Sequence, residues 1–254
     1  LPASSTWPGG IPPEVIAAGD TPAGKAEGIV ATEVGQGVSV MLRSSDPFAR
    51  WEQASVIRGA GKGTVSAVAY AALGDITASQ FQSLANIQRE LGADVRLSNR
   101  QNVVFRGLQE EQLRTLFDRL EAIGMARPGA ELARDVVACP GADTCNIAVT
   151  QSRGLAKAIG ERLEEEGLAE VGGVRINISG CTNSCGQHHA SDIGLFGAER
   201  RAHGRSLPGY QLLLGGYVGE EQIHFGQKAL RLPARTAPEG VARVVRRFAE
   251  ERNA

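Results

Sequence analysis

Apolar and polar positions in the first half of the chain follow patterns that predict a short series of regular elements. Residues 64–73 alternate as in a strand that stops at Gly74. Thr77 and Gln80 form a capping-box signature ahead of apolar residues at near-helical spacing, and Gly92 stands where such a helix ends. Two short strands follow at residues 95–98 and 103–106, and then a second helix that carries Leu113, Leu116, Phe117 and Leu120 and stops at Gly124. The order strand, helix, strand, strand, helix predicts an α+β sandwich of the ferredoxin-like kind.

The pattern changes near residues 126–129, where Ala-Arg-Pro-Gly predicts a domain boundary. Beyond it we expect a helix over about 150–166 with Leu155, Ile159 and Leu163 on one face, and strands at 174–179, 192–196 and 210–218. A last helix, capped by Thr236 and Glu239, carries Val241, Val244, Val245 and Phe248. The chain is therefore expected to hold a Pro- and Gly-rich linker or extension at 1–37, an α+β domain at 38–126, and a second domain of α/β or α+β class at 127–254.

The composition is that of a soluble globular protein, since 42% of the 254 residues are hydrophobic and 22% are charged. A formal net charge of -1 leaves no excess of Lys and Arg, so we expect no nucleic-acid partner. The longest apolar runs, at 65–73 and 212–218, are far shorter than the ~20 residues that span a bilayer. With no membrane span and no export signal, the sequence predicts a cytoplasmic protein without disulfides. The first residue is Leu1 rather than Met, which suggests a longer protein.

The four cysteines of the chain stand in two tight pairs. Cys139 and Cys145 enclose five residues and Cys181 and Cys185 enclose three, and both pairs lie in turns rich in Gly, Pro and Ser. Four thiolates are what a cubane iron–sulfur cluster needs, and such turns free backbone N–H groups to point at sulfur. The predicted helix between the pairs would direct its positive N-terminal end toward the anionic centre. The pattern therefore favours a cluster.

Three other interpretations of the cysteines stay open. Buried Cys often serves only as core filling, although two pairs in polar turns are hard to explain that way. A structural zinc ion also takes four thiolates, but neither gap here is the two residues that zinc sites most often use. A disulfide framework would suit an exported protein, which the sequence does not predict.

Both cysteine motifs resemble those of the assimilatory nitrite and sulfite reductases. The resemblance covers residues 138–146 (Ala-Cys-Pro-Gly-Ala-Asp-Thr-Cys-Asn), 150–155 (Thr-Gln-Ser-Arg-Gly-Leu), 179–189 (Ser-Gly-Cys-Thr-Asn-Ser-Cys-Gly-Gln-His-His) and 192–197 (Asp-Ile-Gly-Leu-Phe-Gly). Residues 51–124 are similar to the ferredoxin-like half-domain of that family, through Gly-Asp-Ile-Thr at 74–77 and Arg-Leu-Ser-Asn-Arg-Gln-Asn at 96–102. The family more often has Pro at the position of Thr182, a difference expected to alter turn stiffness more than ligation.

The resemblance implies a 4Fe-4S cluster on Cys139, Cys145, Cys181 and Cys185, with the sulfur of Cys185 shared with the iron of sirohaem. It also implies that Arg153 and Asn183 contact the sirohaem. The reaction would be reduction of nitrite to ammonia or of sulfite to sulfide, with electrons from ferredoxin or a flavoprotein. The chain would be the C-terminal half of such an enzyme, would depend on an N-terminal half for most substrate contacts, and would turn over poorly alone.

Three further residues are weaker candidates. The position of Arg100 binds the anionic substrate in the first repeat of the family, but this chain resembles the second repeat, where that duty is usually absent. His188 and His189 could bind metal or move protons, although a cubane cluster already has four ligands, so we favour packing near the cofactors. The competing hypothesis for the whole chain is a cluster-bearing electron-transfer module or a zinc-stabilised scaffold that binds no haem.

Overall fold

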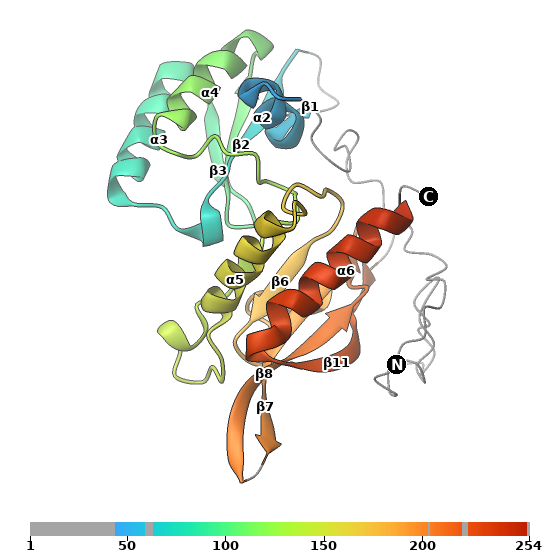
Figure 1. Ribbon diagram of the computed structural model, residues 1–254. Coiled ribbons are helices and arrows are strands. Elements are labelled where there is room, and N and C mark those ends of the chain that lie inside the picture. Colours follow the sequence, from blue (N-terminus) through green and yellow to red (C-terminus); the bar gives the residue numbers. More distant parts are fainter. Residues whose placement is uncertain (1–43, 59–62, 203, 220–222, 253–254) are drawn as a thin grey trace.

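The computed structural model describes residues 44–58, 63–202, 204–219 and 223–252 (Figure 1). The predicted linker at 1–37 lies outside the described residues. Two large sheets, each covered by helices, follow one another along the chain, and each has its own hydrophobic core. The first core is built from residues between Trp51 and Ala126, and the second from residues between Ala133 and Phe248. The chain has the predicted α+β class.

The first unit has a four-stranded antiparallel sheet in the order β1-β2-β4-β3. Its strands are β1 (Val56–Arg58), β2 (Val65–Ala69), β3 (Asp94–Leu97) and β4 (Val103–Leu108). Its α-helices are α2 (Pro47–Ser55), α3 (Ala78–Leu91) and α4 (Leu113–Glu121), with short 3-10 turns at η1 (Ala72–Gly74) and η2 (Glu110–Gln112). The sheet packs on these helices through the side chains of Trp51, Phe105 and Leu116, which are fully buried.

Helix α3 is bounded by the residues that the sequence predicts. The Thr77 hydroxyl accepts from the Gln80 N–H at 3.2 Å, and the Gln80 side chain accepts from the Thr77 N–H at 2.9 Å. Two N–H groups that the first turn would leave unpaired are thereby satisfied. Gly92 ends the helix in the left-handed conformation, with φ of 64°. The predicted capping box and stop are therefore confirmed.

Regular structure begins earlier than residue 64, where the sequence pattern places it. Asp46 caps α2 by accepting from the Ala49 N–H at 3.0 Å, and Pro47 occupies the first turn. The helix has nine residues and buries one short stripe that contains Trp51. So short a stripe gives little periodic signal, so neither α2 nor the strand β1 after it was predicted from the sequence.

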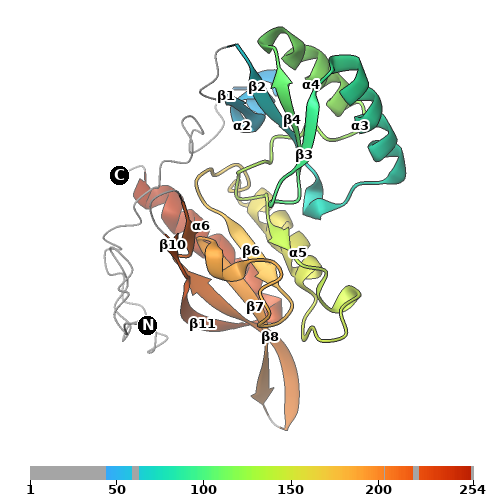
Figure 2. The same cartoon turned by 180° about the vertical axis from the view of Figure 1, so that it is seen from behind.

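The second unit has a five-stranded sheet in the order β11-β8-β7-β6-β5. Its strands are β5 (Val137–Ala138), β6 (Ile176–Ser179), β7 (Ile193–Ala202), β8 (Arg205–Leu214) and β11 (Gln227–Pro233), and a separate pair consists of β9 (Tyr217–Val218) and β10 (Ile223–His224). The helices α5 (Ser152–Glu165) and α6 (Ala237–Arg252) pack side by side on one face, and the 3-10 turns are η3 (Gly141–Asp143), η4 (His188–Ala190) and η5 (Ala234–Thr236). Figure 2 shows the other face of this sheet.

Parts of this second unit differ from the sequence-based expectation. The predicted strand at 210–218 is divided, because β8 ends at Leu214 and Gly215 (φ of 80°) turns the chain before β9. Strand β11 was not predicted from the sequence, because its exposed and half-buried positions alternate without a run of buried residues. Thr236 and Glu239, predicted as a cap, have other partners: Thr236 donates to the Pro233 carbonyl, and Glu239 accepts from Arg162 and Arg243.

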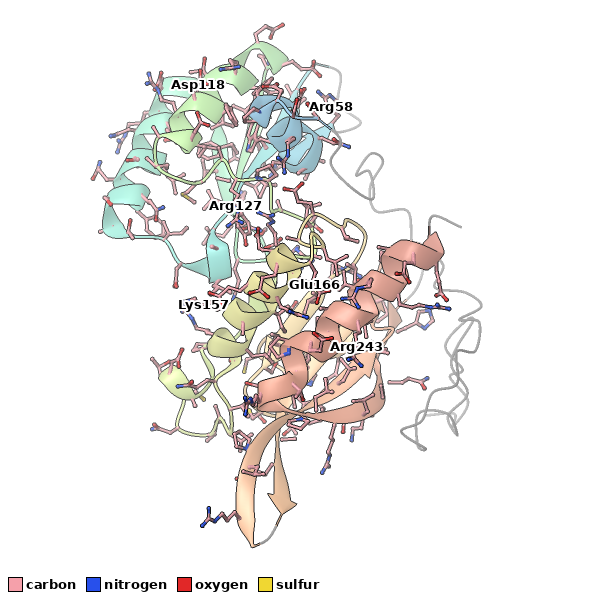
Figure 3. The ribbon with its side chains drawn as sticks, in the orientation of Figure 1. Arg58, Asp118, Arg127, Lys157, Glu166 and Arg243 are labelled. Carbon is pink, nitrogen blue, oxygen red and sulfur yellow. The ribbon has the colours of Figure 1, made fainter. Side chains whose placement is uncertain are left out.

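The two units meet along a polar junction. Tyr70 donates to the Arg134 carbonyl at 3.2 Å, and Arg127 pairs with Glu164 of α5 where the units adjoin (Figure 3). Arg50 of α2 pairs with Glu170 in the second unit. These contacts hold the first unit against the start of the second. None of the described helices combines the length and the apolar character needed to cross a bilayer.

Removal of the α3 cap tests the local account of this helix. We expect Thr77→Ala to lower the free energy of unfolding by about 1 kcal/mol, because the Gln80 N–H loses its acceptor. Thr115→Ala, at an exposed position inside α4, is the matched control, and we expect it to change stability by less than about 0.5 kcal/mol. Urea denaturation checks both. Equal effects at the two positions would contradict the capping role.

Candidate functional site

The two cysteine pairs lie at one edge of the second sheet. Strand β5 runs directly into Cys139, and β6 runs through Gly180 into Cys181. The two strands are neighbours and parallel, with Val137 opposite Asn177 and Ala138 opposite Ile178. Because parallel strands present their carboxyl ends at the same edge, the loops that follow them meet there. Helix α5 makes the return connection between the strands.

The two cysteine loops are in direct backbone contact. The Cys139 N–H donates to the Ile178 carbonyl at 3.1 Å, and the Val149 and Thr150 N–H groups donate to the Gly180 carbonyl at 2.9 and 3.2 Å. A Cβ added at Gly180 would lie 2.8 Å from Gly141 Cα and 2.9 Å from the Thr150 carbonyl oxygen. Only glycine allows the loops to approach this closely. The first and second cysteine motifs therefore form one structural unit.

The sulfur of Cys139 lies in a polar setting suited to a thiolate. The Gly180 N–H donates to Cys139 Sγ at 3.2 Å, so a residue beside Cys181 contacts the sulfur of the first pair. Ser152, the first residue of α5, lies with its hydroxyl 3.4 Å from the same sulfur. The positive end of α5 is thus directed at the cysteine loops, as the sequence analysis predicted, and it stabilises negative charge there.

The second loop contains residues in unusual backbone conformations. Ser184 and Gln187 have φ of 60° and 57°, which non-glycine residues adopt rarely and at some energetic cost. Between them, Cys185 is exposed, whereas the other three cysteines are half-buried. Among the described residues, no three His, Cys, Asp or Glu side chains form a group that could hold a metal ion. A cubane cluster has a different requirement from a single ion, because it spreads its four thiolates over four irons.

His188 is buried directly after this loop. Its Nδ1 lies 2.8 Å from the Ser179 hydroxyl, which also accepts from the Gly186 N–H at 3.0 Å. Its Nε2 is buried and has no hydrogen-bond partner in the described part of the chain. Burial, with a smaller contribution from the neighbouring His189, lowers the pKa of His188 to about 4. The imidazole is therefore neutral at pH 7.

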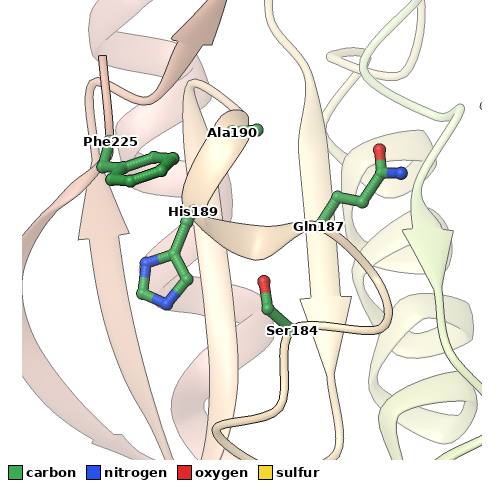
Figure 4. Close-up of a pocket in the computed structure, with 5 residues that line it drawn as sticks. All are labelled: Ser184, Gln187, His189, Ala190 and Phe225. Carbon is green, nitrogen blue, oxygen red and sulfur yellow. The ribbon is translucent and has the colours of Figure 1, made fainter. Parts of the chain in front are cut away.

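A cavity of about 380 Å³ opens at the second cysteine loop. It is lined by Ser184, Gln187, His189, Ala190 and Phe225 (Figure 4). The rings of His189 and Phe225 stand with centroids 6.0 Å apart, and Phe225 is 74% exposed. The volume falls in the range of small-molecule and cofactor sites, which are commonly lined by aromatic side chains.

The three polar residues predicted as site contacts lie in different surroundings. Arg153, in the first turn of α5, pairs with Asp75 of the first unit. Asn183 is exposed in the second cysteine loop. Arg100 is buried, and its Nε and Nη2 donate to the Asp135 carboxylate and carbonyl, both at 2.9 Å. Burial opposes the charge on Arg100, but Asp135 and Glu131 outweigh it and raise its pKa. Two of its nitrogens are thus occupied by Asp135. Its contact with substrate stays a prediction.

Asp135 and Gln101 are site residues that the sequence did not predict. Asp135 is 3% exposed and receives hydrogen bonds from Arg100, Asn102 and the Glu131 N–H. The Gln101 side chain donates to the Ala138 carbonyl, next to Cys139, at 3.1 Å. The only sequence signal was the polar run at 96–102 itself, because its partners lie more than thirty residues away.

Separating the cysteine loops should destabilise the second unit. We expect Gly180→Ala to lower the free energy of unfolding by about 1–3 kcal/mol, because the new methyl group overlaps Gly141 and the Thr150 carbonyl. Gly160→Ala, inside α5 where an added Cβ meets no atom within 4 Å, is the control and should stabilise by about 0.5–1 kcal/mol. Thermal unfolding followed by circular dichroism checks both signs. A neutral Gly180→Ala would contradict the close approach.

The low pKa of His188 should make stability depend on pH. The unfolded chain binds a proton near pH 6.5 that the folded chain takes up only near pH 4, so stability is full above pH 6.5 and falls as the pH drops toward 4, by about 2–3 kcal/mol in all. His188→Phe should lower stability at pH 7 but flatten this decline, as measured by urea denaturation between pH 7 and pH 4. An equally steep decline in the variant would rule out His188 as the titrating group.

Two sequence models of one protein family match the chain. The nitrite and sulphite reductase 4Fe-4S domain matches residues 129–252, and the nitrite/sulfite reductase ferredoxin-like half domain matches residues 58–123. Together they cover about three quarters of the chain.

Relatives and solved structures show the same similarity. The chain is 37% identical over 159 residues to a ferredoxin–nitrite reductase of Synechococcus elongatus, covering 62% of this chain and 31% of that one. It is 30% identical over 189 residues to sulfite reductase [ferredoxin] 2 of Mycolicibacterium paratuberculosis, covering 70% and 34%. The structure of Mycobacterium tuberculosis NirA superposes with a TM-score of 0.66 at 27% identity, over 78% of this chain and 37% of that one. The chain thus spans about a third of the length of these relatives, and it belongs to the nitrite and sulfite reductase family.

Proposed function

We propose that this chain carries the 4Fe-4S and sirohaem centre of a nitrite or sulfite reductase. The observation that carries the proposal is the meeting of two cysteine loops at the carboxyl ends of β5 and β6, with the Gly180 N–H donating to Cys139 Sγ. We assign Cys139, Cys145, Cys181 and Cys185 as the cluster ligands. The domain of residues 127–254 would then hold the cluster, and the domain of residues 38–126 would support the loops that bind it.

The residues present fit a cluster. All four cysteines are free thiols on loops that touch one another, and the Gly180 N–H and the first residue of α5, Ser152, face the sulfur of Cys139. Such donors offset the negative charge of a cluster and influence its potential. The spacing of the cysteines favours a cluster over zinc, because the pairs enclose five and three residues and neither gap is the two that zinc sites most often use.

The residues also fit a haem beside the cluster. Cys185 is exposed and follows Ser184, which lines the cavity with His189 and Phe225, so its sulfur is accessible to a second group. We assign Cys185, Arg153 and Asn183 to the sirohaem, where Arg153 would exchange its pairing with Asp75 for one of the haem carboxylates. When bound, the two centres would pass electrons singly to a small anion. The chain's own part is to hold the thiolates and to keep the Ser179–His188 side of the loop away from water.

The remaining parts of the proposal concern the whole enzyme. The names of the relatives favour ferredoxin as the electron donor and nitrite or sulfite as the substrate. Since the chain spans about a third of those relatives, we propose that a further part of the enzyme supplies most substrate contacts. Arg100 is the one residue here that we retain as a weak candidate for the substrate anion. We expect the enzyme to act in the cytoplasm, without a nucleic-acid or membrane partner.

Metal content and spectra test the proposal. The chain purified without oxygen and reconstituted with iron and sulfide should hold about four irons. Added sirohaem should give its own strong absorption band. The haem iron should also be magnetically coupled to the cluster. We expect Cys181→Ser to lose iron, and Cys185→Ser to lose the coupling. Thr182→Ala, an exposed position between these two cysteines, is the control and should retain both properties.

The possible outcomes separate the alternatives. A colourless, zinc-loaded chain would reject the cluster and support a zinc-stabilised scaffold. Four irons without haem binding would support an electron-transfer module instead. Coupling that survives Cys185→Ser would reject the shared thiolate while leaving the cluster in place.

A further inference from the structure

A loop of the first unit is hydrogen-bonded to the segment that leads into the first cysteine. This loop, residues 98–102, joins β3 to β4, and the strand is β5 (Val137–Ala138), directly before Cys139. The loop is internally fixed, because the Ser98 N–H donates to the Asn102 carbonyl at 2.9 Å and the Asn102 N–H donates to the Ser98 hydroxyl at 3.1 Å. A loop of fixed conformation sets the position of the segment to which it is hydrogen-bonded.

Two buried side chains anchor the loop to Asp135. Arg100 is 8% exposed, Asn102 is 1% exposed and Asp135 is 3% exposed. Besides the two bonds from Arg100, the Asn102 amide donates to the Asp135 carboxylate oxygens at 3.1 and 3.2 Å. Buried charges that are paired and hydrogen-bonded hold a specific geometry, since a displaced partner would leave a charge unpaired away from water. Residue 135 is thereby fixed four positions before the first cysteine.

Gln101 adds a hydrogen bond to the peptide group that joins Ala138 to Cys139. Its side-chain amide donates to the Ala138 carbonyl at 3.1 Å, while the N–H of the same peptide, that of Cys139, donates to the Ile178 carbonyl at 3.1 Å. The peptide is therefore held at both of its polar atoms, once from each unit. Its position sets the direction in which the Cys139 side chain leaves the backbone.

The backbone at Gln101 is costly to maintain. Its φ is 64°, and a Cβ at Gly74 would lie 2.9 Å from the Gln101 Cβ, so the loop also depends on a glycine in η1. Strained residues persist where the surroundings over-determine them, and they often mark functional positions. Here the strained residue is the one that contacts the cysteine strand.

We propose that Gln101 is a positioning residue that fixes Cys139 for the cluster. The inference rests on the proposed function and adds to it a role for the first unit, which supplies no cysteine. Loss of the Gln101 bond frees the peptide at 138–139 and loosens the N–H bond from Gly180 to the Cys139 sulfur. Donors to sulfur stabilise the more negative, reduced cluster, so a looser bond lowers its reduction potential.

Two variants of the full chain test this role. Gln101→Ala removes the side-chain amide, and Gln101→Glu keeps the size but replaces the donor N–H with an acceptor. Gln101 is exposed, so neither change opens a cavity in the core. Gln112→Ala is the matched control, because the Gln112 amide donates to a backbone carbonyl of the same unit, that of Leu91, at 3.0 Å and far along the chain from the cysteines.

Two measurements read out the position of Cys139. In the cluster-free chain, alkylation of Cys139 relative to Cys145, measured by mass spectrometry, should be about two- to fivefold faster in both Gln101 variants. In the reconstituted chain, redox titration followed by electron paramagnetic resonance should give a lower reduction potential in both variants. Gln112→Ala should behave as the wild type in both measurements, whatever its effect on stability.

The outcomes distinguish this inference from the proposed function. Wild-type alkylation and potential in both Gln101 variants would overturn the positioning role while the cluster assignment stands. Equal changes in Gln112→Ala would overturn it as well, since the cause would then be general loss of stability. A wild-type chain that takes up no iron would overturn the proposed function, and this role with it.

Discussion

The parallel pairing of β5 with β6 is the constraint on which the site depends. The two strands are only two and four residues long, yet their register fixes which residues follow at the shared edge. Helix α5 returns the chain between them, so cysteines 36 positions apart are placed on touching loops and the helix N-terminus faces the same edge. A slip of the β5–β6 register would separate the thiols and also misplace Gly180 against Gly141.

The first unit takes part in this arrangement through charge as well as through shape. Arg100 and Asp135 form a buried pair across the junction, and Arg134 lies close by with its side chain 7% exposed between Glu164 and Glu170. A buried pair adds little net stability, but loss of one partner is expensive, at about 3–5 kcal/mol. Such pairs therefore select one docking geometry. The cysteine edge is organised by both units, although all four cysteines belong to one.

The sequence predicted those parts of the molecule whose causes are local. Helix α3 was predicted with its limits because Thr77, Gln80 and Gly92 act within their own turns. Two tight pairs of cysteines predict a metal centre for the same reason, and the family match supports an iron–sulfur cofactor. Helix α2 and strand β11 were missed because each shows too little buried surface to leave a pattern. The partners of Arg100 and Gln101 were missed because their contacts join residues more than thirty positions apart.

Two glycines of the motif at 192–197 are needed for close backbone contacts that the hydrophobic pattern of the sequence does not reveal. A Cβ at Gly194 would lie 1.9 Å from the His188 carbonyl oxygen, and one at Gly197 would lie 2.2 Å from the Gly180 carbonyl oxygen. The backbone of β7 therefore packs at its glycines directly against both ends of the second cysteine loop, Gly180 and His188. That loop stores strain at Ser184 and Gln187, which the contact with β7 and the Ser179–His188 bond can hold in place. The exposed Cys185 thus lies in a turn that β7 and the Ser179–His188 bond support from both sides.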